Sequence, residues 1–159
     1  MASIEKSIDV DVPVRTAYNQ WTQFEEFPRF MEGVKEVRQL DDKNLHWHAE
    51  VMGKDLEWLA EITQQIPDER ITWKSTSGSK NAGSISFQPI APERTRLTLR
   101  MEYEPHGAAE TSASGLGLVS MRVEGDLRRF KRFIEERGHE TGQWRGEIHG
   151  SEIKGQRGY

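Results

Sequence analysis

Residues 10–37 read VDVPVRTAYNQWTQFEEFPRFMEGVKEV, and this stretch decides the fold. A strand-like alternation ends at Pro13, which suits the first turn of a helix because the missing N–H has no partner there anyway. Apolar residues at helical spacing then predict a short helix: Val14, Ala17, Tyr18 and Trp21. Pro28 disfavours helical geometry at Phe27, so we expect a second short helix to start near Pro28 and to end at Gly33.

Period-2 patterns predict strands on both sides of this stretch. Before it, Ile4, Ile8 and Val10 share one face of a strand, with Lys6 as the exception on that face. After it, VKEVRQ begins a run of six alternating segments, followed by LHWHAEV, DLEWLAEIT, DERITWKS, SISFQP and RTRLTLRMEYEP. The connections are too short for crossover helices, so the six segments form an antiparallel meander.

A long amphipathic helix follows the meander in LVSMRVEGDLRRFKRFIEERG. Its apolar residues recur every three or four positions: Val119, Val123, Leu127, Phe130 and Ile134. Gly138 stands where a helix C-terminal glycine belongs. The sequence therefore predicts an α+β domain over residues 1–139. Residues 140–159 are polar, rich in glycine and without period, and we expect a flexible tail whose removal leaves the melting temperature almost unchanged.

Composition limits the classes of function. A chain of 159 residues fits one domain, and a formal charge of -4 with a pI near 5.8 argues against a nucleic-acid footprint. The absence of cysteine excludes disulfides, thiolate metal sites and cysteine nucleophiles. No window reaches the roughly 18 apolar residues of a membrane span, so we expect a cytoplasmic protein, with transient contact to a membrane surface left open.

The order strand, two short helices, six-stranded meander and long C-terminal helix is that of the helix-grip fold. The chain resembles the SRPBCC (START-like) superfamily and, within it, the polyketide cyclase/dehydrase and coenzyme Q-binding START-like group. Three segments carry the resemblance, which spans about residues 3–138: residues 10–37, WLAEITQQIPDERITWKS and DLRRFKRFIEER. It implies a sheet wrapped around the C-terminal helix, with an apolar cavity between them and the short helices over the open side.

Strand parity and the helix stripe then give the side chains of the sheet and the long helix that are expected to bind a ligand, and the resemblance implies that Phe27, Phe30 and Met31 close one end of the cavity. Their apolar character fits a ligand pocket, although each of them could equally pack a solid core. Strand parity also adds Gln64 and Ser75 as polar groups, and the resemblance implies that Phe24 is a further aromatic at one end of the cavity. The predicted ligand-binding residues are Phe27, Phe30, Met31, Trp47, Ala49, Val51, Trp58, Ala60, Ile62, Trp73, Phe87, Leu99, Met101, Tyr103, Val123 and Leu127.

Catalytic and metal motifs are sparse. Nearly every charged strand residue falls on the outward face, which leaves Tyr103 and Lys6 as weak candidates for acid–base chemistry. His46, His48 and Glu50 share a strand face, but that face is the solvent side, so we predict no metal site. The sequence shows no nucleophile elbow or phosphate-binding loop, and we expect no cofactor.

These observations favour a non-enzymatic protein that binds or carries a small hydrophobic molecule such as a lipid, an isoprenoid quinone or a polyketide-like aromatic. The alternative is an enzyme of the cyclase, aromatase or dehydratase type that uses the same cavity. A third interpretation is an interaction module that acts through the tail or through outward-facing tryptophans, and its one support is Trp144 in an otherwise polar tail. The oligomeric state is left open by the sequence.

Overall fold

The computed structural model describes residues 2–105 and 113–154 of the chain. All the predicted elements are present, and two short strands follow the long helix. In chain order the elements are β1 (Ala2–Val10), α1 (Val14–Trp21), η1 (Phe24–Arg29), β2 (Val34–Gln39), β3 (Asn44–Val51), β4 (Lys54–Ile66), β5 (Arg70–Gly78), β6 (Asn81–Ala91), β7 (Arg94–Tyr103), α3 (Ala113–Arg137), β8 (Glu147–His149) and β9 (Glu152–Lys154).

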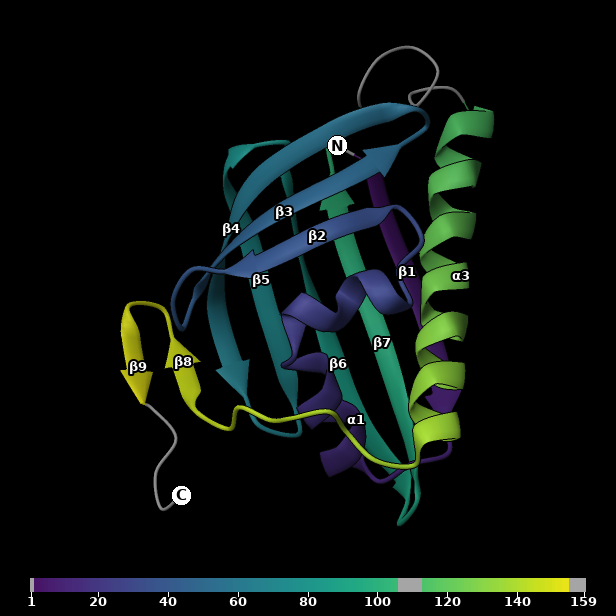
Figure 1. The fold of residues 1–159 in the computed structure, drawn as a ribbon, viewed down its shortest axis with the longest axis vertical. Coiled ribbons are helices and arrows are strands. Elements are labelled where there is room, and N and C mark those ends of the chain that lie inside the picture. The colour runs from purple at the N-terminus through teal and green to yellow at the C-terminus, as the bar shows by residue number, and fades with distance from the viewer. Residues whose placement is uncertain (1, 106–112, 155–159) are drawn as a thin grey trace.

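The strands form one antiparallel sheet in the order β1-β7-β6-β5-β4-β3-β2, with β8 added to β4 and β9 to β8. Figure 1 shows the sheet curving around the helices, with α3 running along β1 and with α1 and η1 on the same side of the sheet as α3. Helix α1 packs against β6 and β7, while η1 packs against β2. This is the helix-grip arrangement, and the predicted fold class is confirmed.

The second short helix differs from the prediction in position and type. It is a 3-10 helix that begins at Phe24, and Pro28 lies inside it. The main-chain N–H groups of Glu26 and Phe30 donate to the carbonyls of Gln23 and Phe27, so the helical bonds used here do not need the N–H that proline lacks. The prediction that this helix starts near Pro28 is therefore wrong by about one turn.

Aromatic rings hold η1 between α1 and α3. The ring centroid of Trp21 lies 5.3 Å from that of Phe27 and 5.0 Å from that of Phe130, and Phe30 lies 5.2 Å from Phe130. All four rings are buried. Tilted and edge-to-face pairs of this kind contribute about 0.5–1.5 kcal/mol each beyond the burial of their area. The phenylalanines of the opening stretch thus join the two short helices to the long one.

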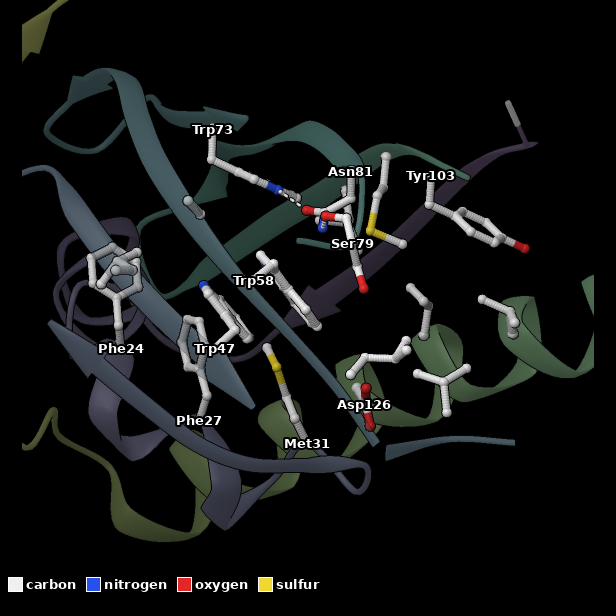
Figure 2. A pocket seen from close by; sticks show the side chains of 18 of the residues that line it. Phe24, Phe27, Met31, Trp47, Trp58, Trp73, Ser79, Asn81, Tyr103 and Asp126 are labelled. Carbon is white, nitrogen blue, oxygen red and sulfur yellow. Dashed lines mark hydrogen bonds between the residues drawn. The ribbon is translucent and has the colours of Figure 1, made fainter. Parts of the chain in front are cut away.

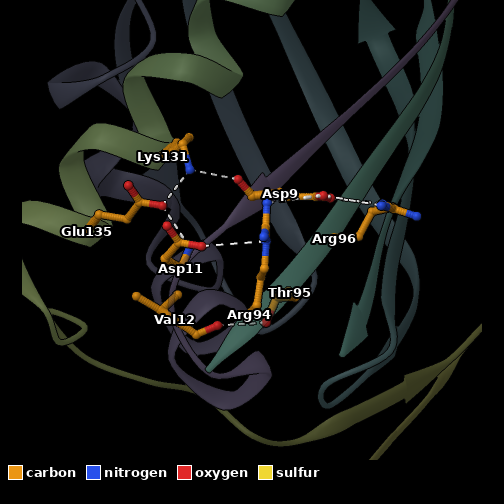
Figure 3. A network of polar contacts seen from close by, with 8 residues as sticks. All are labelled: Asp9, Asp11, Val12, Arg94, Thr95, Arg96, Lys131 and Glu135. Atoms are coloured by element: carbon orange, nitrogen blue, oxygen red, sulfur yellow. Dashed lines mark hydrogen bonds and ion pairs between the residues drawn. The ribbon is translucent and has the colours of Figure 1, made fainter. Parts of the chain in front are cut away.

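A polar network fixes the same C-terminal part of α3 to the end of β1 (Figure 3). Lys131 Nζ donates to the main-chain carbonyl of Asp9 at 2.9 Å, and the main-chain N–H of Asp11 donates to Glu135 at 2.7 Å. Arg96 donates to the Asp9 carboxylate at 2.8 Å and holds the pKa of that carboxyl below its usual value. The end of β1 is therefore bonded to both α3 and β7.

Thr95 makes the buried contact of this region. Its hydroxyl is fully buried and donates to the carbonyl of Val12 at 2.9 Å. We expect Thr95→Val to lower the free energy of unfolding by about 1–3 kcal/mol, because the carbonyl loses its partner away from water. Thr98→Val is the matched control, since the Thr98 hydroxyl pairs with an exposed serine, Ser7, at 2.9 Å. Equal urea midpoints for the two variants would contradict this assignment.

Residues 140–149 pack on the domain and residues 152–154 pair with them as β9, so the prediction of a flexible tail is wrong for this segment; residues 155–159 lie outside the described part of the chain. Gln20 and Thr141 exchange two hydrogen bonds of 3.0 and 2.8 Å. Arg145 donates to Asn19 at 2.6 Å and to Asp68 at 2.8 Å. We call residues 140–149 the C-terminal strap. Its polar residues supply partners for fully buried polar groups of α1, a role that hydropathy does not reveal.

No helix within residues 2–105 and 113–154 is long and apolar enough to cross a membrane.

Candidate ligand-binding site

A cavity of about 230 Å³ lies between the concave face of the sheet, η1 and α3 (Figure 2). Strands β3, β4, β5 and β7 supply half of the residues that line it, and Val119, Val123 and Leu127 line it from α3. Most of the lining side chains are apolar or aromatic. A concave site of this composition, with few polar groups, is typical of pockets for small hydrophobic ligands.

Two stacked tryptophans form the flat part of the wall. Trp47 and Trp58 are paired across β3 and β4, so their side chains leave the sheet at the same point and on the same face. Their rings are nearly parallel, at 9°, with centroids 5.5 Å apart, and Phe27 lies 5.6 Å from Trp47 on the η1 side. Both indoles are only half-buried because they face the open volume of the cavity.

Polar groups near the β5–β6 turn pair with one another. Trp73 Nε1 donates to Asn81 Oδ1 at 3.0 Å, and the Asn81 amide donates to the carbonyl of Ser79 at 3.3 Å. The main-chain N–H of Asn81 donates to Ser75 Oγ at 3.1 Å. Figure 2 shows the Trp73–Asn81 bond at one side of the cavity. These bonds fix the indole of Trp73 in the wall and use the main-chain N–H of Asn81 and one N–H of its side-chain amide.

Asp126 is the carboxyl group that α3 brings to the cavity wall. Its side chain is 16% exposed, and Oδ1 accepts the main-chain N–H of Glu32 at 3.1 Å and a bond from Arg129 Nη2. Burial raises the pKa of Asp126, while the bonds from Arg129 and from the Glu32 N–H oppose that rise. The cavity wall therefore contains a carboxyl group whose charged form is disfavoured by burial and favoured by its hydrogen-bond partners.

Sequence comparison identifies the family to which this architecture belongs. The family described as "Polyketide cyclase / dehydrase and lipid transport" matches residues 10–132. The chain belongs to this family. It is also 48% identical over 149 residues to the "Uncharacterized 17.2 kDa protein in melC2-rnhH intergenic region" of Streptomyces lincolnensis, covering 93% of this chain and 99% of that one.

Solved structures of several proteins share the fold. A Deinococcus radiodurans protein is 28% identical with a TM-score of 0.68, covering 87% of this chain and 99% of its own. The Zhui aromatase/cyclase of a Streptomyces species is 15% identical with a TM-score of 0.74, covering 89% and 98%. A START superfamily protein of Mycobacterium smegmatis is 17% identical with a TM-score of 0.65, covering 85% and 95%. At this identity the last two show the fold alone.

Thirteen of the sixteen predicted ligand-binding residues line the cavity, and three do not. Phe30 packs on Phe130 and Phe133 instead. Phe87 lies under α1, with its centroid 5.3 Å from that of Tyr18. Ala49 is buried on β3 between Trp47 and Val51 and is not among the residues that line the cavity. The contact of the other thirteen with a ligand stays a prediction.

Several lining residues escaped the sequence prediction. Leu45, Leu56 and Ile71 share the inward parity of their strands with residues that were predicted, so the signal was present in the alternation. Asp126 lies seven residues after Val119 and three after Val123, which places a polar residue on the apolar stripe of α3. A carboxylate on such a stripe is the signal that could have found it.

A β-bulge explains why Gln64 fails as a cavity group. The register of β4 against β5 shifts between Ile62 and Gln64, so Gln65 becomes buried and Gln64 pairs with His149 of β8. Beyond a bulge, the side chains that face inward change parity. Ser75 keeps the predicted inward parity, but it does not line the cavity, and its hydroxyl oxygen accepts a hydrogen bond from the main-chain N–H of Asn81.

The two weak catalytic candidates lie in different places. Tyr103 lines the cavity from the end of β7. Lys6 lies outside it and forms an ion pair with Glu124 of α3 at 3.3 Å. In the histidine-containing strand β3, His46 lies 3.2 Å from the carboxylate of Glu57, and His48 lies 3.6 Å from that of Asp55. Within the described residues, no group of three or more His, Cys, Asp or Glu side chains could hold a metal ion.

Proposed function

We propose that this protein binds or carries a small hydrophobic molecule in the cavity between the sheet and α3, in the cytoplasm. The single observation that carries the proposal is the concave apolar wall built by β3, β4, β5, β7, η1 and α3. The ligand class comprises lipids, isoprenoid quinones and polyketide-like aromatics. Membership of a family whose description includes lipid transport supports the proposal.

Binding proceeds by enclosure. Each Å² of apolar ligand surface that leaves water contributes roughly 25 cal/mol, and the half-buried indoles of Trp47 and Trp58 lose water at the same time. The rings are already held by their stack and by Phe27, so little side-chain freedom is lost when a ligand enters. A flat or chain-like apolar molecule fits such a wall.

A cyclase, aromatase or dehydratase is the second candidate, and Asp126 is the observation that favours it. A carboxyl in an apolar cavity with a raised pKa is the kind of group that transfers protons in general acid–base catalysis. Under this hypothesis the same apolar wall would fold a reactive chain against Asp126. The two candidates share the cavity and differ in whether the molecule that leaves it is changed.

Native mass spectrometry of the protein purified from its own host tests the first candidate. We expect a stoichiometric apolar molecule, released into organic solvent and identical to one already present in the cell extract. Cargo that appears only when the protein is present would favour the enzyme. A protein that arrives empty and takes up no apolar fluorescent probe would contradict both.

A further inference from the structure

We propose that Asp126 accepts a hydrogen bond from a hydroxyl group of the ligand, so that the cavity selects hydroxyl-bearing apolar molecules over equally apolar ones without a donor. This inference rests on the proposed binding function and specifies the polar end of the ligand. It assigns a binding role to Asp126, a helix residue that the sequence prediction of ligand-binding side chains did not include.

The two oxygens of Asp126 have different surroundings. Oδ1 accepts both hydrogen bonds made by this carboxyl, one from the main-chain N–H of Glu32 at 3.1 Å and one from Arg129. Arg129 is itself held, because its Nε donates to the carbonyl of Phe30 at 3.0 Å. Among the described residues, none donates a hydrogen bond to Oδ2. The carboxylate is thus fixed through one oxygen and keeps acceptor capacity on the other.

The position of Asp126 places that capacity in the cavity. Its neighbours along α3 that line the same wall are Val123 and Leu127. Figure 2 shows the carboxyl on the α3 side, across the view from Trp73 and Asn81 and beside apolar side chains of the helix. A ligand that fills the space between the sheet and α3 must therefore pass close to this group.

The other polar groups of the wall are less suited to recognising a hydroxyl. Asn81 Oδ1 accepts from Trp73, and one of the two amide N–H groups of Asn81 donates to the carbonyl of Ser79, so part of the capacity of this neutral side chain is already used. Lys80 and Glu104 lie at an exposed rim, where their 3.9 Å ion pair competes with water. Asp126 combines burial, a fixed position and a spare lone pair. A hydrogen bond to a charged acceptor is also stronger than one between neutral groups.

The charges around Asp126 keep it suited to this role. Arg129 and Arg122 both act to stabilise its charged form, against the burial that raises its pKa. An apolar ligand without a donor would displace water from Oδ2 and leave it unsatisfied in a dry cavity. A ligand hydroxyl replaces that water with a hydrogen bond. Selection therefore comes as much from rejecting the molecule that lacks a donor as from binding the one that has it.

Two matched probes test the proposal with the full-length protein: 2-naphthol, which donates a hydrogen bond, and 2-methoxynaphthalene, which does not. The quantity measured is the ratio of their dissociation constants, the ether over the naphthol, from fluorescence titration. Asp126→Asn should lower this ratio by about tenfold to a hundredfold, which is the contribution expected of a hydrogen bond to a charged acceptor. Size differences between the probes cancel when the same ratio is compared between variants.

Glu124→Gln is the matched control. It replaces an acid by its amide on the same helix, at a residue that pairs with Lys6 and Arg128 outside the cavity, and should leave the ratio unchanged. An Asp126→Asn variant that folds, as judged by circular dichroism, and keeps the wild-type ratio would overturn the proposal. An Asp126→Asn variant that loses affinity for both probes by the same factor would also overturn the proposal, because an equal loss indicates a structural role for Asp126.

The wild-type protein gives a second readout that needs no variant. Without an acceptor in the cavity, the preference between the probes should follow their partition from water into cyclohexane, which favours the ether. A wild-type ratio equal to that partition ratio would overturn the role of Asp126 even if the variant failed to fold. Failure of the wild type to bind either probe would instead count against the proposed binding function, so the two failures are distinguishable.

Discussion

Trp58→Glu is expected to abolish the uptake of apolar ligands while the domain still folds. Trp58 is half-buried because it faces the cavity, and its ring stacks on Trp47 with centroids 5.5 Å apart. A carboxylate at this position must either be desolvated beside the ligand or draw water into the cavity. Either outcome costs several kcal/mol of binding free energy, so affinity for an apolar fluorescent probe should fall by at least about a hundredfold.

The adjacent residue supplies the control. Leu59 lies next to Trp58 on β4 but points to the outer face, where it is 37% exposed. Leu59→Glu puts the same charge on the same strand and should leave the affinity for the probe unchanged. Met101→Glu, on the cavity face of β7, should behave like Trp58→Glu. Undiminished uptake in a folded Trp58→Glu protein would show that the ligand binds elsewhere.

The fold followed from the sequence because most of its strands obey one rule. In β3, Trp47 and Val51 alternate with polar residues, so the face that meets the helices is legible in the amino-acid order. The stripe of α3 is equally regular, and its partner face on the sheet follows from it. Most of the cavity wall could be predicted for the same reason, because the residues that line the cavity are inward-facing residues that border open space instead of packing against a side chain of the opposite wall.

The errors arose where a local feature interrupted that rule. A bulge in β4 exchanges the roles of Gln64 and Gln65, and no residue type in this stretch announces it. Asp126 was missed because acidic residues on a helix are usually solvated. Here the carboxyl is instead bonded to the main-chain N–H of Glu32, which lies outside α3, and to the side chain of Arg129, one turn further along α3. Position on the stripe predicts the burial of Asp126 better than its residue type does.

The C-terminal strap was missed for a different physical reason. The alternation of apolar and polar residues in a sequence predicts which apolar side chains are buried. The strap, however, is held largely by polar side chains that form hydrogen bonds with buried polar groups. Asn19 and Gln20 are fully buried on α1, and their partners come from residues more than 120 positions later in the chain. Such pairing becomes visible only when the two segments are brought together.

Ile148→Ala is expected to destabilise the protein by about 2–5 kcal/mol, although it lies in a segment that composition assigns to a tail. Ile148 is fully buried, belongs to the hydrophobic core and pairs with Gln65 at the end of β4. For a domain of this size the melting temperature should fall by roughly 5–15 °C. Removal of residues 140–159 should cost more, because Asn19 and Asp68 would also lose the bonds from Arg145.

Ile153→Ala is the control that tests whether the loss of stability comes from burial of the side chain or only from its presence in the β8–β9 hairpin. Ile153 stands opposite Ile148 in the β8–β9 pair but is 38% exposed, so its loss should change stability by no more than about 0.5 kcal/mol. Equal melting temperatures for the wild type and Ile148→Ala would mean that β8 does not pack on β4 in solution. A large loss confined to Ile148→Ala would make the strap part of the folded domain, because only a docked β8 removes that side chain from water.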